Sequence, residues 1–366
     1  NTRSRGLGDV YKRQIVDYSS YFKNKNIVIT GHTGFKGSWL CQWLYMLGAK
    51  ISAFSLDIPS TPAHYNELKV KYIADERINL IDSNKVFKFI SDAKPDYLFH
   101  LAAQPLVLES YRNQYNTYMS NTMGTLNILE ALKRYNNKCA AVIITSDKCY
   151  ENLDNIIDYA ESDRLGGIDP YSTSKASAEL IFNGYKNSFF MHENSNINAC
   201  TTRAGNVIGG GDWAWNRLVP DCFRSWSKQE EVIIRNPEAT RPWQHVLDPL
   251  NGYLKLACNL ADNRKLNGEA FNFGPESSYT VSTLVENLSN HFDGSRWNID
   301  RDINLPHESK LLSLNCEKSR NILNINQKIG LDMMSEWTSS WYKNFYNNIK
   351  ISSTTVNQIE EFMNLD

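Results

Sequence analysis

Residues 26–37 read NIVITGHTGFKG, an apolar run followed by three glycines at a spacing of three residues. The apolar run is typical of a buried strand, and the apolar residues that follow from Ser38 to Leu44 are typical of a helix. A strand, a glycine turn and a helix N-terminus together cradle a dinucleotide, because the backbone can approach the pyrophosphate at the positive end of the helix. The spacing G-x-x-G-x-x-G only approximates the common fingerprint. We predict that this turn binds a dinucleotide through Gly31, Thr33, Gly34, Phe35 and Gly37.

A carboxylate at the end of the next apolar run indicates which dinucleotide is bound. Asp57 follows the run 50–56 and lies twenty residues after Gly37. A carboxylate at about this distance accepts hydrogen bonds from the adenosine ribose and repels a 2′-phosphate. No arginine follows directly to accommodate that phosphate. The sequence therefore predicts NAD rather than NADP.

The composition excludes several classes of partner. The 366 residues include 39 basic and 40 acidic side chains, a net charge of -1, which removes any global electrostatic case for nucleic acid or an anionic membrane. No run approaches the ~18 apolar residues of a membrane span, and no secretory signal is visible. The seven cysteines are scattered without a C-x-x-C pair, and the seven histidines form no metal-binding motif. We expect a cytoplasmic protein without a metal site.

Strand-like and helix-like segments alternate from residue 26 onward, which predicts an α/β fold with a parallel, doubly wound sheet of the Rossmann type. Residues 1–14 are basic, begin without Met and are expected to be a non-native or disordered tail. We predict an NAD-binding domain over 20–206, with a returning segment near 240–275, and a smaller, discontinuous mixed α/β substrate-binding lobe over 207–350. The predicted strands are 26–30, 50–56, 76–81, 96–101, 140–145, 197–203 and 270–274, and the predicted helices are 36–47, 83–92, 111–135 and 171–189.

Tyr171 and Lys175 stand four residues apart just after Asp169-Pro170, a helix-start signal. This spacing places the phenol and the ammonium on one helical face. A neighbouring cation favours the phenolate, so the pKa of the phenol is expected to fall from ~10 toward neutrality, with help from the positive nicotinamide ring. Such a tyrosine can remove a proton from a substrate hydroxyl while hydride leaves the attached carbon.

A polar cluster follows the apolar strand 140–144. Ligands in open α/β sheets bind beyond the carboxyl ends of the strands, so this cluster is expected in the active site. Ser146 can hydrogen-bond the reacting hydroxyl, Asp147 is a candidate acid and Lys148 a candidate base.

Several motifs together resemble those of the extended short-chain dehydrogenase/reductases, and within them the CDP-glucose 4,6-dehydratases. The resemblance covers roughly residues 20–345 and rests on GHTGFKGSW (31–39), HLAAQP (100–105), TSDKCY (145–150), YSTSK (171–175), RAGNVIGGGDW (203–213) and RPWQHV (241–246). It implies C4 oxidation of CDP-glucose by NAD, loss of water across C5 and C6, and return of the hydride to C6, as in deoxysugar biosynthesis for surface polysaccharides such as O-antigen. In this reaction Asp147 protonates the departing C6 hydroxyl, and Lys148 is either the C5 base or an electrostatic stabiliser of the enolate.

The resemblance also implies roles for binding residues. Asp82 is placed near the adenine, Ala102 and Ala103 near the cofactor phosphates, and Tyr171 and Lys175 against the cofactor as well as the substrate. Asn206 and Arg241 match positions that contact the substrate diphosphate, and Arg217 and Arg301 are further candidates because arginine pairs well with phosphate. His307 is a candidate at the base or sugar. The helices at 111–135 and 171–189 resemble a pair that forms a homodimer interface.

Two alternatives stay open at this point. One is another nucleotide-sugar enzyme of the same superfamily, a 4-epimerase or a decarboxylase. The other is a non-catalytic NAD-binding regulator, although such proteins tend to lose the tyrosine or the lysine. The pair Asp147-Lys148 favours the dehydratase, because an epimerase has no use for this additional acid and base. The dTDP-glucose dehydratases resemble the chain but carry Asp-Glu there.

Overall fold

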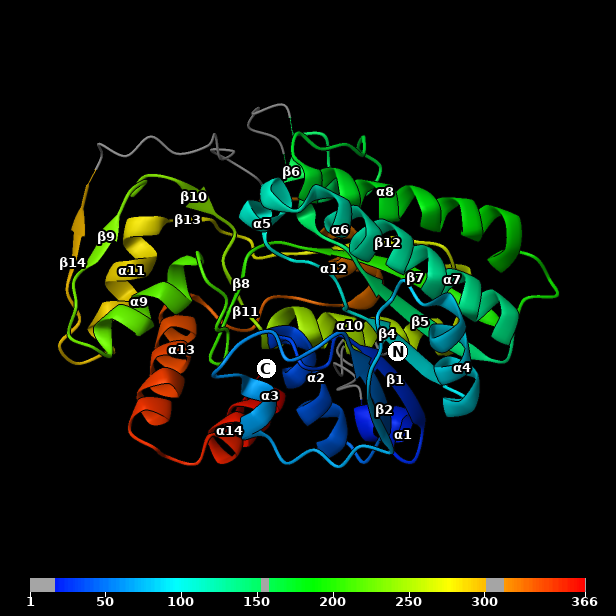
Figure 1. Ribbon diagram of the computed structural model, residues 1–366, viewed down its shortest axis with the longest axis horizontal. Helices are drawn as coiled ribbons and strands as arrows, with labels where there is room; N and C mark the ends of the chain where they lie inside the picture. Colours follow the sequence, from blue (N-terminus) through cyan, green and yellow to red (C-terminus); the bar gives the residue numbers. More distant parts are fainter. Residues whose placement is uncertain (1–16, 153–157, 301–312, 366) are drawn as a thin grey trace, which may run out of the picture.

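A parallel sheet of seven strands forms the centre of the protein (Figure 1). The computed structural model describes residues 17–152, 158–300 and 313–365. The tail expected at residues 1–14 and the candidate residues Arg301 and His307 lie outside these ranges. From edge to edge the sheet contains β12 (Ala270–Phe273), β7 (Ile197–Ala204), β5 (Cys139–Ile144), β4 (Tyr97–His100), β1 (Asn26–Thr30), β2 (Lys50–Ser55) and β3 (Ala74–Arg77). Every neighbouring pair is parallel, which confirms the predicted Rossmann-type sheet.

The strand order reverses between β1 and β4. The chain runs outward from β1 through β2 to β3, and then crosses to β4, β5, β7 and finally β12 on the other side. In open α/β sheets the ligand binds outside the carboxyl ends of the strands at such a reversal. The segments that follow β1, β4 and β5 therefore define where the site should be found.

Helices cover both faces of this sheet, as parallel strands require. Ile27 and Ile29 of β1 share one core cluster with three helices, α1 (Tyr18–Phe22), α2 (Phe35–Met46) and α10 (Leu247–Asp262). Val28, which points to the opposite face, shares the second cluster with α4 (Ser83–Ala93), α7 (Gly124–Tyr135) and α8 (Pro170–Tyr185).

Most predicted strands are confirmed within a residue or two, and one is misplaced. The third strand was expected at 76–81, but β3 spans Ala74–Arg77. It is an edge strand with three exposed residues, so it carries little apolar signal. The apolar residues Ile78 and Leu80 follow the strand and enter the core from the loop beyond it. The returning strand expected near 270–274 is β12, which pairs with β7.

The helix expected over 111–135 is confirmed from Gln114 to Tyr135, with a π-helical turn inside it. It consists of α6 (Gln114–Tyr118), the π turn (Met119–Met123) and α7 without a break, and a separate helix, α5 (Val107–Arg112), precedes it. The extended φ of -140° at Asn113 separates α5 from α6. The π turn directs Asn121 inward, where it is 1% exposed, and such turns are frequent at functional sites. A second π turn, Lys186–Phe190, ends α8.

A smaller lobe lies beside the carboxyl side of the sheet, at the left in Figure 1. Its elements include α9 (Leu218–Trp226), β9 (Val232–Ile234), β10 (Thr240–Arg241), β13 (Tyr279–Thr280), α11 (Val281–Asn290), β14 (Trp297–Ile299) and α13 (Leu331–Tyr346). Smaller pairs join distant segments: β8 (Val207–Ile208) with β11 (Gln244–His245), and β6 (Asp158–Tyr159) with β15 (Ser313–Leu314). The remaining helices are α3 (His64–Glu67), α12 (Glu317–Leu323) and α14 (Ile351–Asn364).

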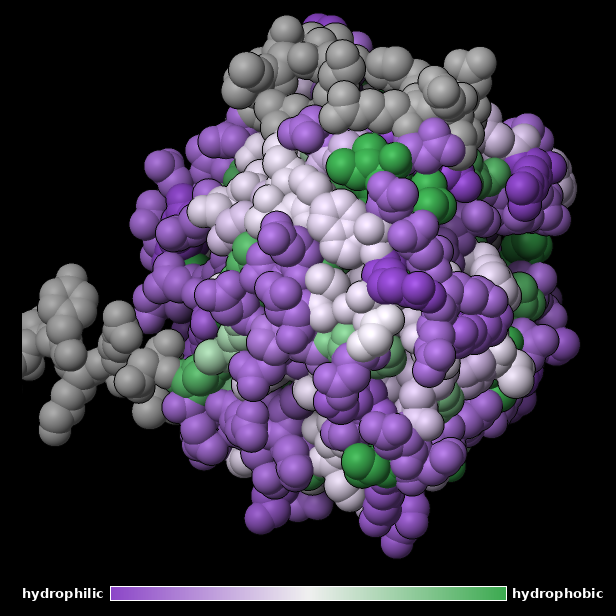
Figure 2. Space-filling view, turned by 90° about the vertical axis from the view of Figure 1, so that its left-hand side faces the viewer, coloured by the Kyte–Doolittle hydropathy of each residue, from purple (hydrophilic) through white to green (hydrophobic). Residues whose placement is uncertain are grey.

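The C-terminal helix α14 packs back against the cofactor domain. His64 joins the two, because its Nδ1 lies 2.9 Å from Ser38 Oγ of α2 and its Nε2 lies 3.0 Å from Thr355 Oγ1 of α14. The lobe end of the molecule presents a mainly hydrophilic surface with only small hydrophobic spots (Figure 2). Among the described residues, none of the helices combines the length and apolar character that crossing a bilayer requires.

Candidate active site

The glycine turn after β1 is built by close backbone contacts. Gly31 has a φ of +76°, and a Cβ there would lie 2.6 Å from the backbone nitrogen of Ala102. A Cβ on Gly37 would lie 2.1 Å from the carbonyl oxygen of Gly31. Only glycine fits either position, so the turn, α2 and the segment after β4 meet at van der Waals distance. This explains why the predicted cofactor residues of the turn and Ala102-Ala103 lie together.

The N-terminus of α2 is open to a ligand. Its N-cap is Gly34, and no side chain caps the first turn. The first N–H groups of a helix have no intrahelical partner and carry the positive end of the helix dipole. An anion such as a pyrophosphate fits this requirement.

Asp57 lies at the rim of the same turn. Thr33 Oγ1 donates a hydrogen bond of 2.6 Å to the Asp57 carbonyl oxygen, which ties the end of β2 to the turn. The Asp57 carboxylate is exposed, and its Oδ1 accepts from the Ile58 N–H at 2.8 Å. A carboxylate held beside the glycine turn suits a ribose diol. Asp82, by contrast, caps α4 by accepting from the Lys85 N–H at 3.1 Å, and this hydrogen bond lowers its pKa.

The polar cluster after β5 folds into a tight turn. Ser146 is the N-cap of a 3-10 turn over Asp147–Cys149, and its Oγ accepts from the Lys148 N–H at 3.2 Å. The same hydroxyl donates to Asp147 Oδ1 at 2.9 Å. Asp147 is 3% exposed, and within the described ranges its Oδ2 is a buried oxygen without a hydrogen-bond partner. An orphan carboxylate oxygen in a cleft is a docking point for a ligand hydroxyl.

Helix α8 places Tyr171 and Lys175 against this turn. Asp169 and Ser172 form a capping box, and Pro170 is the first helical residue, so the start of the helix is fixed. Tyr171 and Lys175 are both buried, as is Ser146. The sequence thus predicted the meeting of these residues from local signals alone.

The prediction that Lys175 lowers the pKa of the Tyr171 phenol is wrong for the protein by itself. Burial raises the pKa of Tyr171 to about 12, although a hydrogen bond with Ser146 acts in the opposite direction. The Lys175 ammonium donates to the Ile144 carbonyl oxygen at 3.5 Å, and burial together with the nearby Lys36 lowers its pKa to about 8. The spacing of Tyr171 and Lys175 predicted that the two side chains lie together. It did not predict that the effect of burial on the tyrosine pKa exceeds the effect of nearby charges.

Arg217 is one of the predicted substrate residues, and it lies near Tyr171. Arg217 Nη1 forms an ion pair of 3.0 Å with Asp212, and its Nη2 donates to the Pro105 carbonyl oxygen at 3.4 Å. Arg217 therefore bridges the lobe and the loop after β4, and it interacts electrostatically with Tyr171.

Gly205, which precedes Asn206, lies close to Asp147 and to Pro242, which follows Arg241. A Cβ on Gly205 would lie 3.6 Å from Asp147 Oδ2 and 3.1 Å from Pro242 Cγ, so the neighbours of Asn206 and Arg241 lie next to the orphan oxygen. The Asn206 carbonyl oxygen accepts from the Gln244 N–H at 3.0 Å. Arg241 is buried, and its Nη1 donates to the Thr240 carbonyl oxygen at 2.9 Å.

Lys36 belongs to the site but was not predicted. Burial and the neighbouring Arg217 lower its pKa to about 8, while Asp147 acts in the opposite direction. Its ammonium also lies 5.9 Å from the ring centre of Tyr253. The sequence did offer one signal for Lys36. The positive end of a helix disfavours a cation, so a lysine in the glycine turn indicates that it has a function there.

A buried ion pair beneath the site was also missed. The Glu179 carboxylate accepts from Arg203 Nη2 at 2.8 Å, from Thr201 Oγ1 at 2.9 Å and from Thr145 Oγ1 at 2.5 Å. Arg203 also donates to Tyr150 Oη at 2.9 Å. Glu179 lies one turn after Lys175 on α8, so this network fixes the catalytic helix to the ends of β5 and β7. The only local signal for Glu179 was its position four residues after Lys175, which places both side chains on the same face of α8.

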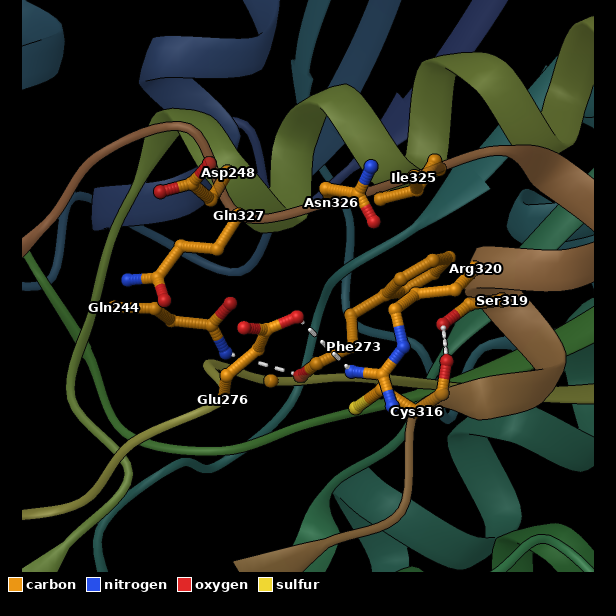
Figure 3. A pocket seen from close by; sticks show the side chains of 11 residues that line it. Gln244, Asp248, Phe273, Glu276, Cys316, Ser319, Arg320, Ile325, Asn326 and Gln327 are labelled. Atoms are coloured by element: carbon orange, nitrogen blue, oxygen red, sulfur yellow. Dashed lines mark hydrogen bonds and ion pairs between the residues drawn. The ribbon is translucent and has the colours of Figure 1, made fainter.

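A small pocket at the carboxyl end of β12 is separate from these residues (Figure 3). Gln244 Nε2 donates to the Phe273 carbonyl oxygen at 3.0 Å, and Arg320 pairs with Glu276 at 3.6 Å. Asp248 at its wall accepts from the Lys328 N–H at 2.8 Å, and burial raises its pKa to about 7. None of the predicted site residues lines this pocket within the described part of the chain.

Comparisons with known proteins agree with this geometry. A model described as the NAD dependent epimerase/dehydratase family matches residues 27–274. The CDP-glucose 4,6-dehydratase of Salmonella typhimurium is 41% identical over 335 residues, 88% of this chain and 93% of that protein. The UDP-glucose 4-epimerase of Mycoplasma genitalium is 24% identical over 88% of this chain and 97% of its own.

Solved structures share the fold. An epimerase from Methanothermobacter thermautotrophicus has a TM-score of 0.79 at 23% identity, covering 93% of this chain and 98% of its own. A UDP-glucose-4-epimerase from Stenotrophomonas maltophila with bound NAD has a TM-score of 0.77 at 18% identity, covering 89% of this chain and 100% of its own. The predicted fold, cofactor and dehydratase resemblance are confirmed by these comparisons.

Proposed function

The chain belongs to the NAD dependent epimerase/dehydratase family, and we propose that it converts CDP-glucose to CDP-4-dehydro-6-deoxyglucose. It is an NAD-dependent enzyme that acts on a nucleotide sugar. The observation that carries the finer proposal is Asp147, a buried carboxylate with a partnerless oxygen between Ser146 and Gly205. A dehydratase needs such an acid at the departing hydroxyl, and an epimerase does not.

The residues around the glycine turn fit NAD. The uncapped N-terminus of α2 suits the pyrophosphate, Asp57 suits the ribose diol, and the backbone of Ala102 packs against Gly31 of the turn. Asp82 belongs at the adenine end in this proposal. When bound, NAD takes a hydride from C4 of the sugar and returns it to C6.

The protein's own side chains move the protons. Tyr171 removes the proton from O4 while Ser146 hydrogen-bonds the same oxygen, and Lys175 supports the phenolate by its charge. Lys148 removes the proton from C5, which the new ketone has made acidic, or stabilises the enolate. Asp147 gives its proton to O6, which leaves as water.

Binding of the substrate rests on arginine and asparagine side chains. Arg217 and Arg241 supply cations for the diphosphate, and Asn206 accepts from the Gln244 N–H three residues after Arg241. Arg301 and His307 remain candidates for the same substrate. The cytosine base is proposed from the 41% identical relative.

We also propose a homodimer through α5–α8. Large apolar side chains are exposed along these helices, including Tyr111 at 46%, Tyr115 at 72% and Leu180 at 59%. A monomeric mass by light scattering at micromolar concentration would contradict this assembly. A reducing, cytoplasmic compartment is supported by the cysteines, all seven of which are buried and free.

The test uses purified enzyme and four nucleotide-diphosphate glucoses, with CDP, dTDP, UDP or GDP. Mass spectrometry should find the loss of one water from CDP-glucose, without consumption of added NAD. CDP-glucose deuterated at C4 should give product deuterated at C6. An isomer of unchanged mass would indicate a 4-epimerase, and stoichiometric accumulation of free NADH would indicate a simple dehydrogenase.

A further inference from the structure

Lys36 is a cation at a position that the helix backbone disfavours. It is the second residue of α2, whose N-terminus has no side-chain cap and carries the positive end of the helix dipole. The side chain is only partly exposed, and the described residues give its ammonium no ion pair and no hydrogen bond. A partly buried charge without such a partner is costly, so Lys36 requires a function that the folded chain alone does not explain.

The Lys36 side chain runs toward the carboxyl ends of β5 and β12. Its ammonium lies 5.9 Å from the ring centre of Tyr253 on α10, and that ring lies 5.9 Å from the ring of Phe273, the last residue of β12. The Lys175 ammonium reaches the same side of the sheet, since it donates at 3.5 Å to the carbonyl oxygen of Ile144, the last residue of β5. The two ammonium groups are close enough that Lys36 contributes, after burial, to the lowered pKa of Lys175.

This is the half of the site where the nicotinamide belongs. A dinucleotide spans the point where the strand order reverses, with one mononucleotide on each side. Asp57, the proposed ribose ligand, follows β2, so the adenosine belongs over β1 and β2 and the nicotinamide over β4 and β5. Tyr171 and Lys175, which must reach the reacting carbon, lie on this second side. The Lys36 ammonium therefore lies on the nicotinamide side of the glycine turn.

We propose that Lys36 is a fixed positive charge beside the nicotinamide that favours the reduced over the oxidised cofactor. The inference rests on the NAD-dependent function proposed above. When the C4–H bond of the sugar breaks, its two electrons and its hydrogen pass to the nicotinamide ring, which loses its positive charge, and the O4 proton passes to Tyr171. Repulsion between Lys36 and the ring is present before this step and absent after it. Lys36 thereby assists the oxidation of C4, and it helps to retain the reduced cofactor until the hydride returns to C6.

Other charges around Lys36 decide which quantity the test must measure. Burial, together with the charge of Arg217, lowers the pKa of Lys36 to about 8, and Asp147 acts in the opposite direction. The main alternative is a contact between Lys36 and the phosphates of the cofactor. Such a contact would stabilise both redox states equally, because both carry the same phosphates. The ratio of the NADH and NAD affinities therefore distinguishes the proposed role from a phosphate contact.

The test equilibrates purified enzyme, without sugar, with NAD and NADH at known ratios and about pH 6.5, where Lys36 is cationic. Bound cofactors are isolated by rapid gel filtration, released and quantified by chromatography. Wild type should take up NADH in preference to NAD. Lys36→Met and Lys36→Gln should each lower this preference by about tenfold, the scale of two unit charges roughly 10 Å apart near a protein surface. Lys88→Met is the matched control, because this lysine is 76% exposed on α4 and its loss should leave the preference unchanged.

Three results would overturn the inference. In the first, both neutral variants keep the wild-type preference within about twofold, which would assign Lys36 to the phosphates or to packing. In the second, Lys88→Met changes the preference as much as the Lys36 variants do, so that the loss of any positive charge suffices. The third needs no variant, and it is a wild-type enzyme that prefers NAD to NADH. Because the measurement contains no sugar, an enzyme that dehydrates no nucleotide sugar would refute the proposed function and leave this result unaffected.

Discussion

Replacing Glu179 by Gln should destabilise the protein by about 3 kcal/mol, because it breaks a buried ion pair. The Glu179 carboxylate is 1% exposed and Arg203 is 3% exposed, so water cannot replace a lost partner. Removing one member of such a pair typically costs about 3–5 kcal/mol. Arg203 keeps two acceptors, Tyr150 Oη at 2.9 Å and the Glu161 carbonyl oxygen at 3.1 Å, which places the cost at the lower end.

The glutamine also introduces a local mismatch. If the amide oxygen takes the place of Glu179 Oε2, it can still accept from Thr201 and Arg203, but the amide NH2 group then faces the hydroxyl of Thr145 in place of an acceptor. A loss of about 3 kcal/mol reduces the folding equilibrium constant by about 100-fold. Since Glu179 fixes α8 to β5 and β7, the same change should loosen Tyr171 and Lys175, which lie two turns and one turn earlier on the helix.

Urea denaturation followed by circular dichroism measures the loss. Glu286→Gln is the matched control, because this carboxylate is exposed on α11 and its loss should cost less than about 0.5 kcal/mol. The double variant Glu179→Gln with Arg203→Met should be less destabilised than the sum of the single variants, because it removes the unpaired charge. A loss below about 1 kcal/mol for Glu179→Gln, or strict additivity in the double variant, would refute the reasoning.

Three further substitutions address the site and its surroundings. Tyr171→Phe should lose about 100- to 10,000-fold in activity while retaining NAD; wild-type turnover would rule out its role. Asp147→Asn should still oxidise C4 but not expel water, so reduced cofactor should build up on the enzyme, and its absence in a single turnover would remove Asp147 from the elimination. Burial raises the pKa of Asp248 to about 7, so the folded state retains a proton that the unfolded chain has lost, and stability should fall as the pH rises from about 4 through 7. Asp248→Asn should remove up to about 2.6 kcal/mol of that pH dependence between urea titrations at about pH 5 and pH 8, and an unchanged dependence would show that other groups cause it.

The fold was predictable where local signals agree with long-range packing. The apolar runs of β1, β4 and β5 are buried on both faces, so their hydrophobicity identified them. The edge strand β3 has a polar sequence, Ala74–Arg77, and its position depends on pairing with β2. The π turn inside the predicted helix 111–135 was likewise not predicted, and it places Asn121 where its side chain meets Gln104 and Ser174.

The site was predictable as far as it consists of motifs. Ser146, Asp147, Tyr171 and Lys175 each follow a strand end or a helix start, and such positions can be read along the chain. The raised pKa of Tyr171 could not be predicted, because burial is a property of the whole fold.

The sequence also did not predict contacts between site residues that lie far apart along the chain. Glu179 meets Thr145, Thr201 and Arg203, and Lys36 interacts with Asp147 and Arg217, across separations that no local pattern encodes. Both residues are charged side chains among apolar or glycine-rich neighbours. Such residues need a partner or a function, and this is the signal that a sequence offers for them.

The closed electron and proton balance of the proposed reaction explains why its catalytic groups are so deeply buried. A simple dehydrogenase must exchange its cofactor and release a proton in every turnover, so its site must communicate with solvent. A dehydratase that returns its hydride to the same sugar needs neither exchange. Tyr171 and Asp147 are accordingly only 8% and 3% exposed. Exclusion of water strengthens every charge interaction in the cleft, including those of Lys36 and Lys175 with their neighbours. In the proposed reaction, the burial that raises the pKa of Tyr171 in the protein alone also strengthens the effect of nearby positive charges on the phenolate.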